Sequence, residues 1–470
     1  MINTIANKRW LVLGLGDTGL SLTRWLLRQG ASVRVADTRD NPPHITKLSR
    51  DFSGVDLITG PYQAATFADV DGIAISPGVS LREPIIAAAA TRGVPIVGDV
   101  ELFGQAIASK RDSTKVIGIT GSNGKSTVAT MVGDMCKTAG LNTVVAGNIG
   151  LPVLDALSAA EESQSGAAPN CYVLELSSFQ LETTANLALN AATVLNVTED
   201  HLDRYDGMDD YAAAKARIFR HCNHQVLNRD DFYSVAMKKT GTAVSYFSPS
   251  IPLGPDYWGL ISTRGEQWLA HDQTPIMALA DLPVAGGHNA INALAALALA
   301  RAIDLPDEPL VEALKRFRGL PHRVEKVMDI GTVGFYDDSK GTNVGATVAA
   351  LNGMKEKVVL IAGGDGKGQD FSPLNAAVAK HARAVVLIGR DADKIEAAIA
   401  SSGVATIRAK TMEDAVKLSL QLSDPGDRVL LSPACASFDM FNNYAHRAQV
   451  FVDAVRSLAA AQRPISNGTV

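Results

Sequence analysis

One glycine-rich segment near the end of the first quarter of the chain reads Lys115-Val116-Ile117-Gly118-Ile119-Thr120-Gly121-Ser122-Asn123-Gly124-Lys125-Ser126-Thr127, and the fold class follows from it. Its first six residues contain the apolar run Val116–Ile119 and predict a buried strand, and a helix is expected to begin near Lys125. The glycines between them let backbone N–H groups close around phosphate oxygens, and the helix N-terminus adds a positive dipole end. Lys125 would reach the β and γ phosphates, and Ser126 or Thr127 would offer a hydroxyl to Mg²⁺. The predicted nucleotide contacts here are Gly121, Asn123, Gly124, Lys125, Ser126 and Thr127.

The strict phosphate-loop pattern is not met, because its first glycine position falls on Ile119 and Gly118 stands one place early. The alternative is a tight strand-to-helix turn with an incidental lysine. A strand before the loop and a helix after it favour the phosphate loop.

Outward from this loop, short β-branched runs alternate with glycine-rich turns and Ala/Leu-rich helical stretches, which predicts α/β folding with helices on both faces of largely parallel sheets. A chain of 470 residues suggests about three domains. The rhythm restarts accordingly, and we expect domains at residues 1–113, 114–319 and 320–470. Strands are predicted at 10–13, 31–36, 72–75, 115–120, 171–176, 193–197, 334–336, 357–362, 384–388 and 428–431, with loops or short strands over 247–283.

Composition excludes several classes of protein. The 44 Lys and Arg against 49 Asp and Glu give a net charge of -5, which argues against a large nucleic-acid surface. Four scattered cysteines form no disulfide framework, which fits a reducing compartment. The stretch from Met1 to Trp10 has no signal-peptide core, and the richest apolar stretch, 290–302, is too short to span a bilayer. We therefore expect a cytoplasmic protein without a membrane or nucleic-acid partner.

Two strand ends downstream of the loop offer metal ligands. Glu175 ends an apolar strand, and a carboxylate at the carboxyl end of a strand beside a phosphate loop suits Mg²⁺. His201 follows another strand in the run Asn196–Tyr205. A lone histidine there is more often a capping or surface group, but its position after a strand end favours a ligand role.

The first domain carries a second glycine pattern. Gly14, Gly16 and Gly19 follow a strand and open a helix, and Asp37 lies 21 residues after Gly16 (37 − 16) at the end of the next strand. This is the dinucleotide fingerprint with an acid placed for a ribose, so by itself it predicts an NAD-dependent oxidoreductase. The same geometry also suits the diphosphate of a UDP-sugar.

At this point the chain resembles the Mur ligase family, which also includes folylpolyglutamate synthetases. The carrying motifs, in the family's order, are Thr120–Thr127, Glu175–Ser178, Thr198–Asp203, Gly287–Asn289, Leu320–Glu325 and Asp337–Asn343. The resemblance implies a UDP-binding Rossmann-like domain, a central P-loop ATPase-like domain and a Rossmann-like domain for the incoming amino acid. It implies ATP contacts at Asn289, Arg323 and Asp338, and Mg²⁺ or Mn²⁺ held by Ser126, Glu175 and His201. Lys215 matches the lysine that the family carbamylates, and a carbamate would give the metal anionic oxygen where a bare ammonium would repel it.

The resemblance also implies the small-molecule substrates. Thr18, Asp37, Thr38, Arg39, Ser76 and Gly78 match the family's UDP-binding segments, and Asn148 matches a turn near substrate and ATP. UDP is favoured over NAD because a phosphate loop with metal ligands follows and no hydride-transfer dyad appears. The alternative of a structural or binding-only protein is weaker, because it would require four chemically suited residues to have no function: Lys125, Glu175, His201 and Asp338.

The third domain resembles the branch that adds D-glutamate to UDP-N-acetylmuramoyl-L-alanine in peptidoglycan precursor synthesis. A distal carboxylate needs a cation and hydroxyl donors, and the expected contacts are Lys340, Thr342, Lys367, Ser437, Phe438 and Tyr444. Gly341 and Tyr444 depart from the alanine and phenylalanine usual in that branch. Another amino acid, or a folylpolyglutamate synthetase, therefore stays an alternative. The implied reaction forms an acyl phosphate from ATP, with Lys125, His201, Lys215 and Arg323 as catalytic groups, in a monomer.

Four tempting features have plainer interpretations. His221–His224 lacks a second ligand pair at zinc spacing and is interpreted as a helix end. Cys435 has no paired base and is expected to be a buried thiol. His446-Arg447 is interpreted as a helix surface, and His322 as a residue that positions the loop presenting Arg323.

Overall fold

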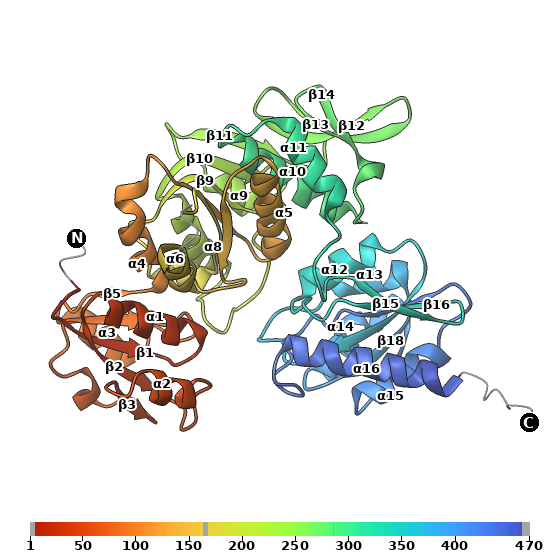
Figure 1. Ribbon diagram of the computed structural model, residues 1–470. Coiled ribbons are helices and arrows are strands. Elements are labelled where there is room, and N and C mark those ends of the chain that lie inside the picture. The colour runs from red at the N-terminus through yellow and green to blue at the C-terminus, as the bar shows by residue number, and fades with distance from the viewer. Residues whose placement is uncertain (1–4, 163–167, 285, 463–470) are drawn as a thin grey trace, which may run out of the picture. The chain divides into compact units, whose positions relative to one another are not determined.

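The computed structural model describes residues 5–162, 168–284 and 286–462 and contains three sheets (Figure 1). The chain divides into two compact units. The first contains Met1–Val197, Asp209–Asp281 and Ile291–Arg316, and the second contains Thr198–Met208, Leu282–Ala290 and Phe317–Val470. The first two sheets lie in the first unit, so the predicted boundaries at 113/114 and 319/320 stay a prediction.

The first sheet is parallel, with strand order β3-β2-β1-β4-β5. Its strands are β1 (Arg9–Leu13), β2 (Ser32–Asp37), β3 (Asp56–Thr59), β4 (Gly72–Ile75) and β5 (Ile96–Val97). Its helices are α1 (Asp17–Arg28), α2 (Ile45–Asp51), α3 (Pro84–Thr91) and α4 (Asp99–Ile107). The order reverses at β1 and β4, so the glycine turn after β1 lies at the switch point where such sheets bind ligands.

The second sheet has nine strands in the order β14-β13-β12-β11-β10-β9-β6-β8-β7. The strands are β6 (Lys115–Thr120), β7 (Thr143–Gly147), β8 (Cys171–Glu175), β9 (Ala188–Val194), β10 (His221–Asn228), β11 (Ala243–Phe247), β12 (Tyr257–Thr263), β13 (Glu266–His271) and β14 (Thr274–Ala278). The last three pair antiparallel and the others parallel. The helices are α5 (Lys125–Thr138), α6 (Val153–Glu162), α7 (Ser178–Glu182), α8 (Met208–Ala216), α9 (Phe232–Ala236), α10 (Gly287–Arg301) and α11 (Asp307–Arg316).

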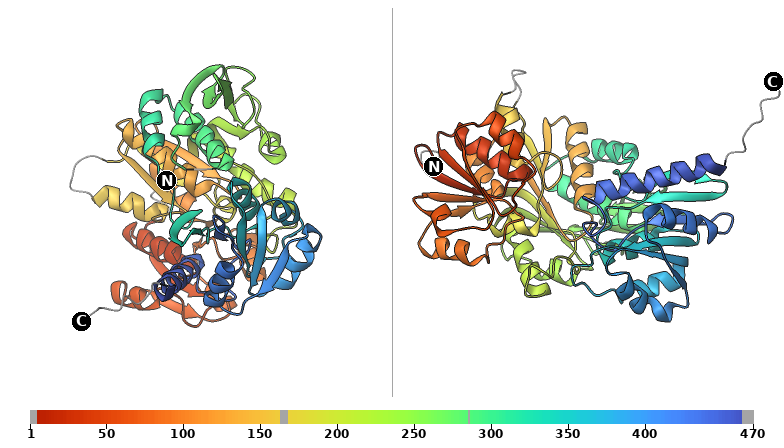
Figure 2. Two further views of the ribbon diagram at one scale, coloured as in Figure 1. Left: turned by 90° about the vertical axis from the view of Figure 1, so that its right-hand side faces the viewer. Right: turned by 90° about the horizontal axis from the view of Figure 1, so that it is seen from below.

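The third sheet has six strands in the order β15-β16-β20-β17-β18-β19, parallel except for the β15–β16 hairpin. Its strands are β15 (Glu325–Ile330), β16 (Val333–Asp337), β17 (Val358–Gly363), β18 (Ala382–Ile388), β19 (Ala405–Arg408) and β20 (Arg428–Leu431). Its helices are α12 (Val344–Gly353), α13 (Leu374–His381), α14 (Ala392–Ile399), α15 (Met412–Gln421) and α16 (Tyr444–Gln462). One apolar cluster packs α12, α13 and α14 on one face, and a second packs α15 and α16 on the other (Figure 2).

Polar contacts join α1 and α4 to the elements of the second sheet within the first unit. Asp155 on α6 accepts from Ser21 Oγ at 2.9 Å and is ion-paired with Arg24, both on α1. On α4, the buried Glu101 accepts from two backbone amides that follow α7, Ala185 N at 2.7 Å and Asn186 N at 2.9 Å. These hydrogen bonds hold the loop after α7 to α4 and give the buried carboxylate its donors.

Three sequence-based expectations need correction or restriction. The strand expected at 193–197 ends at Val194, because the next residues leave the sheet to bind the phosphate loop. His221–His224 begins the central strand β10 and is not a helix end. The N-terminal stretch Met1–Trp10 lies partly outside the described residues, and within the described ones no helix is long and apolar enough to cross a membrane.

Candidate functional site

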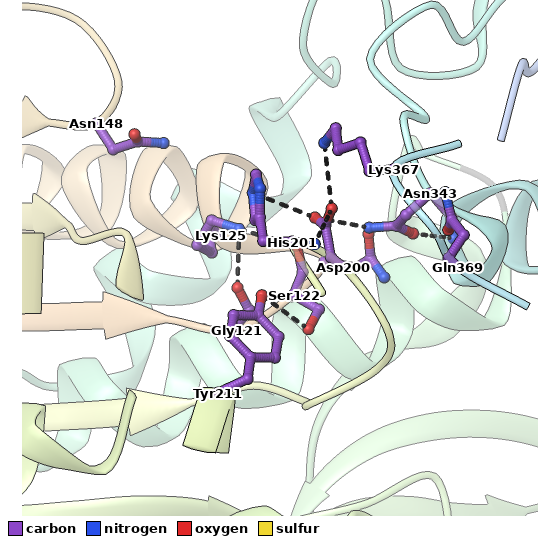
Figure 3. Close-up of polar contacts among 12 residues, drawn as sticks. Gly121, Ser122, Lys125, Asn148, Asp200, His201, Tyr211, Asn343, Lys367 and Gln369 are labelled. Atoms are coloured by element: carbon purple, nitrogen blue, oxygen red, sulfur yellow. Dashed lines mark hydrogen bonds and ion pairs between the residues drawn. The ribbon is translucent and has the colours of Figure 1, made fainter. Parts of the chain in front are cut away.

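The phosphate loop joins β6 to α5, as predicted. Lys125, the first residue of α5, folds back over the loop and donates from Nζ to Gly121 O at 2.8 Å and Ser122 O at 2.9 Å (Figure 3). Gly124 has φ +84°, which a residue with a Cβ rarely adopts. The hydroxyl-bearing Ser126 and Thr127 follow in the first turn of α5 and are buried. The loop has the form of an anion cradle with its lysine in place.

A residue that the sequence-based prediction missed holds this loop. Asn196, just beyond β9, accepts from Asn123 N through Oδ1 at 2.8 Å and donates from Nδ2 to Asn123 O at 3.1 Å. Its own carbonyl accepts from Ser122 N at 2.9 Å. Asn196 stands at the start of a motif noted for His201, but nothing local in the sequence shows that its side chain reaches back 73 residues.

Glu175 ends β8 beside the phosphate loop, where its Cα pairs with Ile119 of β6. Its side chain is 2% exposed. Oε1 accepts from Asn148 Nδ2 at 2.8 Å, whereas Oε2 has no hydrogen-bond partner among the described residues. A buried carboxylate oxygen without a partner is costly unless a cation or donor binds there. Glu175 therefore fits the oxygen chemistry of Mg²⁺, with Asn148 orienting it.

Lys215, on α8, also reaches this loop. It is 1% exposed and donates from Nζ to Gly121 O at 3.0 Å. The same nitrogen lies 4.3 Å from the centre of the Tyr211 ring. The Tyr211 hydroxyl accepts from Ser122 Oγ at 3.3 Å (Figure 3). A buried lysine on a carbonyl and an aromatic face is held in one position at the phosphate loop.

The glycine turn of the first sheet is built around Asp37, the last residue of β2. Its carboxylate accepts from Leu15 N at 2.7 Å and from Arg39 N at 2.9 Å. The Arg39 side chain adds Nε at 2.8 Å and Nη2 at 2.6 Å. Burial raises the pKa of Asp37, but the hydrogen bonds from Arg39 and Leu15 outweigh it and lower that pKa below its ordinary value. The acid is therefore ionised and already held by the turn.

The third glycine of the fingerprint is required by packing, since a Cβ on Gly19 would lie 1.8 Å from Gly14 O. Ser76, after β4, donates from Oγ to that same carbonyl at 3.2 Å. Thr18 on α1, Thr38 after β2 and Gly78 after β4 stand at the same carboxyl end of this parallel sheet. All the predicted UDP-binding residues thus belong to one edge of the first sheet.

In the second unit, Asp200 in the loop after β9 contacts two loop residues that follow strands of the third sheet. Lys367 Nζ lies 3.3 Å from Asp200 Oδ1, and Asn343 Nδ2 donates to Oδ2 at 3.3 Å (Figure 3). His201 adopts a left-handed φ of +57°, with Nε2 at 3.6 Å from Asp200 Oδ2. Asp200 and Asn343 belong to the family motifs Thr198–Asp203 and Asp337–Asn343, but the sequence did not predict them as site residues. Their pairing, 143 residues apart, carries no local signal.

Asp338, directly after β16, is buried and accepts from Ser432 Oγ at 2.6 Å. Burial raises the pKa of its carboxyl to about 7, while the Ser432 hydrogen bond and the charge of Arg323 act in the opposite direction. Arg323 Nε is buried without an acceptor among the described residues. His288, before Asn289 at the start of α10, has its pKa lowered by burial and by the same arginine. Arg323 is thus a cation with unused hydrogen-bonding capacity.

The predicted amino-acid contacts follow strands of the third sheet. Lys340 and Thr342 follow β16, Lys367 follows β17, and Ser437 and Phe438 lie between β20 and Tyr444, the first residue of α16. Lys340 Nζ lies 5.5 Å from the ring centre of the half-exposed Tyr444, and Thr342 follows in the same loop. Ser437 is buried, whereas the Phe438 ring is 74% exposed. These side chains offer a cation and hydroxyls on one side of the third sheet.

Two further expectations are settled here. Cys435 is a buried thiol whose pKa burial raises to about 12, as expected for a structural cysteine. Arg447 was wrongly interpreted as helix surface. It is 1% exposed and donates to Ser339 Oγ, Ser339 O and Cys435 O at 3.0, 2.8 and 3.1 Å, and burial lowers its pKa to about 10. The arginine holds the Ser339 turn and the Cys435 loop to α16.

Comparisons with known proteins agree in all three regions. Residues 8–98 match the description "Mur ligase MurD-like, N-terminal domain", residues 119–300 "Mur ligase middle domain", and residues 322–435 "Mur ligase, glutamate ligase domain". A UDP-N-acetylmuramoylalanine--D-glutamate ligase of Methylobacillus flagellatus is 57% identical over 454 residues, which cover 97% of this chain and 98% of that protein. One of Thiobacillus denitrificans is 57% identical over 474 residues, covering 98% of each chain. The solved UDP-N-acetylmuramate-alanine ligase MurC of Thermotoga maritima shares the fold, with a TM-score of 0.61 at 21% identity over 96% of this chain and 100% of that one.

Proposed function

The chain belongs to the Mur ligase family and is an ATP-dependent ligase, and from this premise we propose that it joins D-glutamate to UDP-N-acetylmuramoyl-L-alanine in peptidoglycan precursor synthesis. The relatives that carry that activity in their names match nearly the full length of both chains. The dinucleotide fingerprint of the first sheet therefore belongs to a ligase, and an NAD-dependent oxidoreductase is not supported.

One structural observation carries the proposal: a buried carboxylate with an oxygen lacking a partner, Glu175 Oε2, stands at a strand end beside a lysine-bearing phosphate loop. This pairing suits a nucleoside triphosphate with its metal and has no use in a purely structural domain. Mg²⁺, when bound, neutralises charge on the phosphate oxygens, and Ser126, Glu175, Lys215 and His201 are the residues that would hold it.

In the proposed reaction the alanine carboxylate attacks the γ-phosphate of ATP, giving an acyl phosphate and ADP. Lys125 leaves the loop carbonyls to bind the phosphates, and Arg323 uses its unpaired donor to stabilise the charge of the transferring group. Asn289 and Asp338 bind the nucleotide. The D-glutamate amine then attacks the acyl phosphate, and the tetrahedral intermediate collapses to amide and phosphate. The chain's contribution is mainly positioning and charge stabilisation.

We propose that Lys215 acts as a carbamate. Its nitrogen is held by Gly121 O, and a carbamate keeps one N–H for that bond while adding anionic oxygens for a metal. Labelled bicarbonate should give a carbamate signal in the native protein and none in Lys215→Ala. Loss of activity in that variant, partly restored by short carboxylic acids, is expected. Full activity of Lys215→Ala, or no response to added acids, would reject the carbamate.

The D-glutamate carboxylates are proposed to bind Lys340, Thr342, Lys367, Ser437, the backbone at Phe438, and Tyr444. Lys367 already forms an ion pair with Asp200, so the position of its ammonium group is set before the substrate binds. On the UDP side, Thr18, Asp37, Thr38, Arg39, Ser76 and Gly78 are proposed to hold the nucleotide at the edge of the first sheet.

The decisive experiment measures phosphate release with ATP, Mg²⁺ and UDP-N-acetylmuramoyl-L-alanine, comparing D-glutamate with L-glutamate, L-lysine and diaminopimelate. Release with D-glutamate alone is expected. Release with a different amino acid would keep the ligase chemistry and reject the assignment of the third domain, and release with none would reject the proposed substrates. We further propose a cytoplasmic monomer with domains at 1–113, 114–319 and 320–470. Light scattering and limited proteolysis test the oligomeric state and the boundaries.

A further inference from the structure

The loop that carries Arg323 has an unusual backbone. His322 has φ +62° and Val324 has φ +49°, so the arginine stands between two non-glycine residues in the left-handed region. This conformation is unfavourable for both and especially for the β-branched valine, and it persists only where surrounding contacts impose it. The backbone on both sides of Arg323 is therefore held in its conformation by contacts of the neighbouring residues.

Arg323 itself makes no side-chain hydrogen bond or ion pair within the described residues, and its Nε is buried without an acceptor. Among the described residues, the guanidinium therefore has no hydrogen-bonding partner that fixes its position. A long side chain in that situation loses much of its preorganisation unless the loop beneath it is rigid.

The contacts that hold the loop converge on His322. Its ring Nδ1 lies 2.7 Å from Asp337 Oδ2, its backbone N donates to Glu325 Oε2 at 2.9 Å, and its carbonyl accepts from Lys340 N at 3.2 Å. Asp337 is 1% exposed at the end of β16, and its other oxygen accepts from Ser339 N at 2.9 Å. One carboxylate oxygen of Asp337 is thus held by the turn after β16, and the other contacts the His322 ring of the strained loop.

His322, Glu325 and Asp337 also place possible ligand atoms within 4.8 Å of one another. Hydrogen bonds explain the cluster without a metal, because Asp337 accepts at both oxygens and Glu325 binds a backbone amide. The three residues therefore stabilise the conformation of the loop through hydrogen bonds.

We propose that Asp337 is a positioning residue for Arg323, holding the His322 ring so that the left-handed loop presents the arginine to the transferring phosphoryl group. This inference rests on the proposed function. It assigns Asp337 no contact with substrate. The effect of Asp337 must then disappear when Arg323 is absent.

The test is a double-mutant cycle on steady-state phosphate release. Asp337→Ala should lower kcat about tenfold, the scale expected when a catalytic group is displaced by a fraction of an ångström, with KM for D-glutamate unchanged. In an Arg323→Ala background the same change should cost less than about twofold, because coupled residues are non-additive. Equal losses in both backgrounds, or no loss in Asp337→Ala, would overturn the proposal.

Two further variants separate positioning from folding. Asp337→Asn should stay within about threefold of wild type, since an amide can accept from Ser339 and donate to the other tautomer of His322. His322→Asn should be more active than His322→Ala, because asparagine tolerates the left-handed conformation better. Asp329→Asn, an exposed carboxylate on β15, is the matched control and should change nothing. If the wild-type chain releases no phosphate, the proposed function fails first, and this inference falls with it.

Discussion

Alanine at Gly124 is the most informative perturbation of the phosphate loop. Gly124 has φ +84°, and a Cβ there would lie 2.6 Å from Asn292 Oδ1 and 3.3 Å from Leu195 Cδ1, where ordinary contacts begin at 3.4 Å. The left-handed conformation costs about 1–2 kcal/mol for alanine, and relieving the contacts costs about 1–3 kcal/mol more. The loop's phosphate-binding conformation is therefore disfavoured by about 2–5 kcal/mol in Gly124→Ala.

If that cost falls on nucleotide binding, the Kd for a non-hydrolysable ATP analogue with Mg²⁺ rises by about 30-fold to several thousand-fold, since about 1.4 kcal/mol is tenfold. Isothermal titration calorimetry measures it directly. Gly140→Ala is the matched control, because Gly140 has φ +88° with no atom within 4 Å of the Cβ position. That variant should lose about 1–2 kcal/mol of stability and keep its nucleotide affinity. Gly124→Ala binding within threefold of wild type, or equal losses in both variants, would refute the reasoning.

Three other outcomes are expected. Glu101→Ala should lose about 1–3 kcal/mol in urea unfolding, because a buried carboxylate that accepts from two backbone amides is removed. The exposed Glu162→Ala should change the free energy of unfolding by less than about 0.5 kcal/mol, and similar values for both variants would contradict the burial argument. Burial raises the pKa of Asp338 to about 7 from an ordinary 3.8, so the folded state binds the extra proton, and stability is lost as pH rises between those values. Asp338→Asn should flatten that decline in urea midpoints and be the more stable protein at pH 8, and parallel pH profiles would count against it. Asn148→Ala removes the donor to Glu175, so the Mg²⁺ concentration for half-maximal phosphate release should rise about tenfold, and an unchanged magnesium dependence would reject that role.

The strands that the sequence predicted best are buried parallel ones. The strands predicted at 115–120 and 72–75 contain the continuous apolar runs 116–119 and 72–75, and they form β6 and β4 with the predicted bounds. Such strands are covered on both faces, so their pattern needs no partner to be recognised. His221–His224 escaped recognition because the first half of β10 is polar and partly exposed, and only pairing with β9 and β11 makes it a strand.

The site shows the same division. Lys125 and Glu175 were predictable, because a glycine loop before a helix and a carboxylate at a strand end are local arrangements. Three other features could not be predicted: the hydrogen bonds of Asn196 to Asn123, the pairing of Asp200 with Asn343, and the burial of Arg447. Each joins residues 73, 143 or 108 positions apart, and no local pattern records such a contact.

By itself, then, the sequence determined the α/β class, the phosphate loop and the family of this ligase, because these depend on hydrophobic runs, glycine conformations and ordered motifs within short windows. Only the tertiary structure decided which polar side chains support that chemistry. Asn196 holds the phosphate loop, and within the part of the chain that the structure describes Glu175 keeps one oxygen without a hydrogen-bond partner. The physical reason is that burial and hydrogen-bond satisfaction are properties of the packed chain, set by whichever distant residues fold against each group.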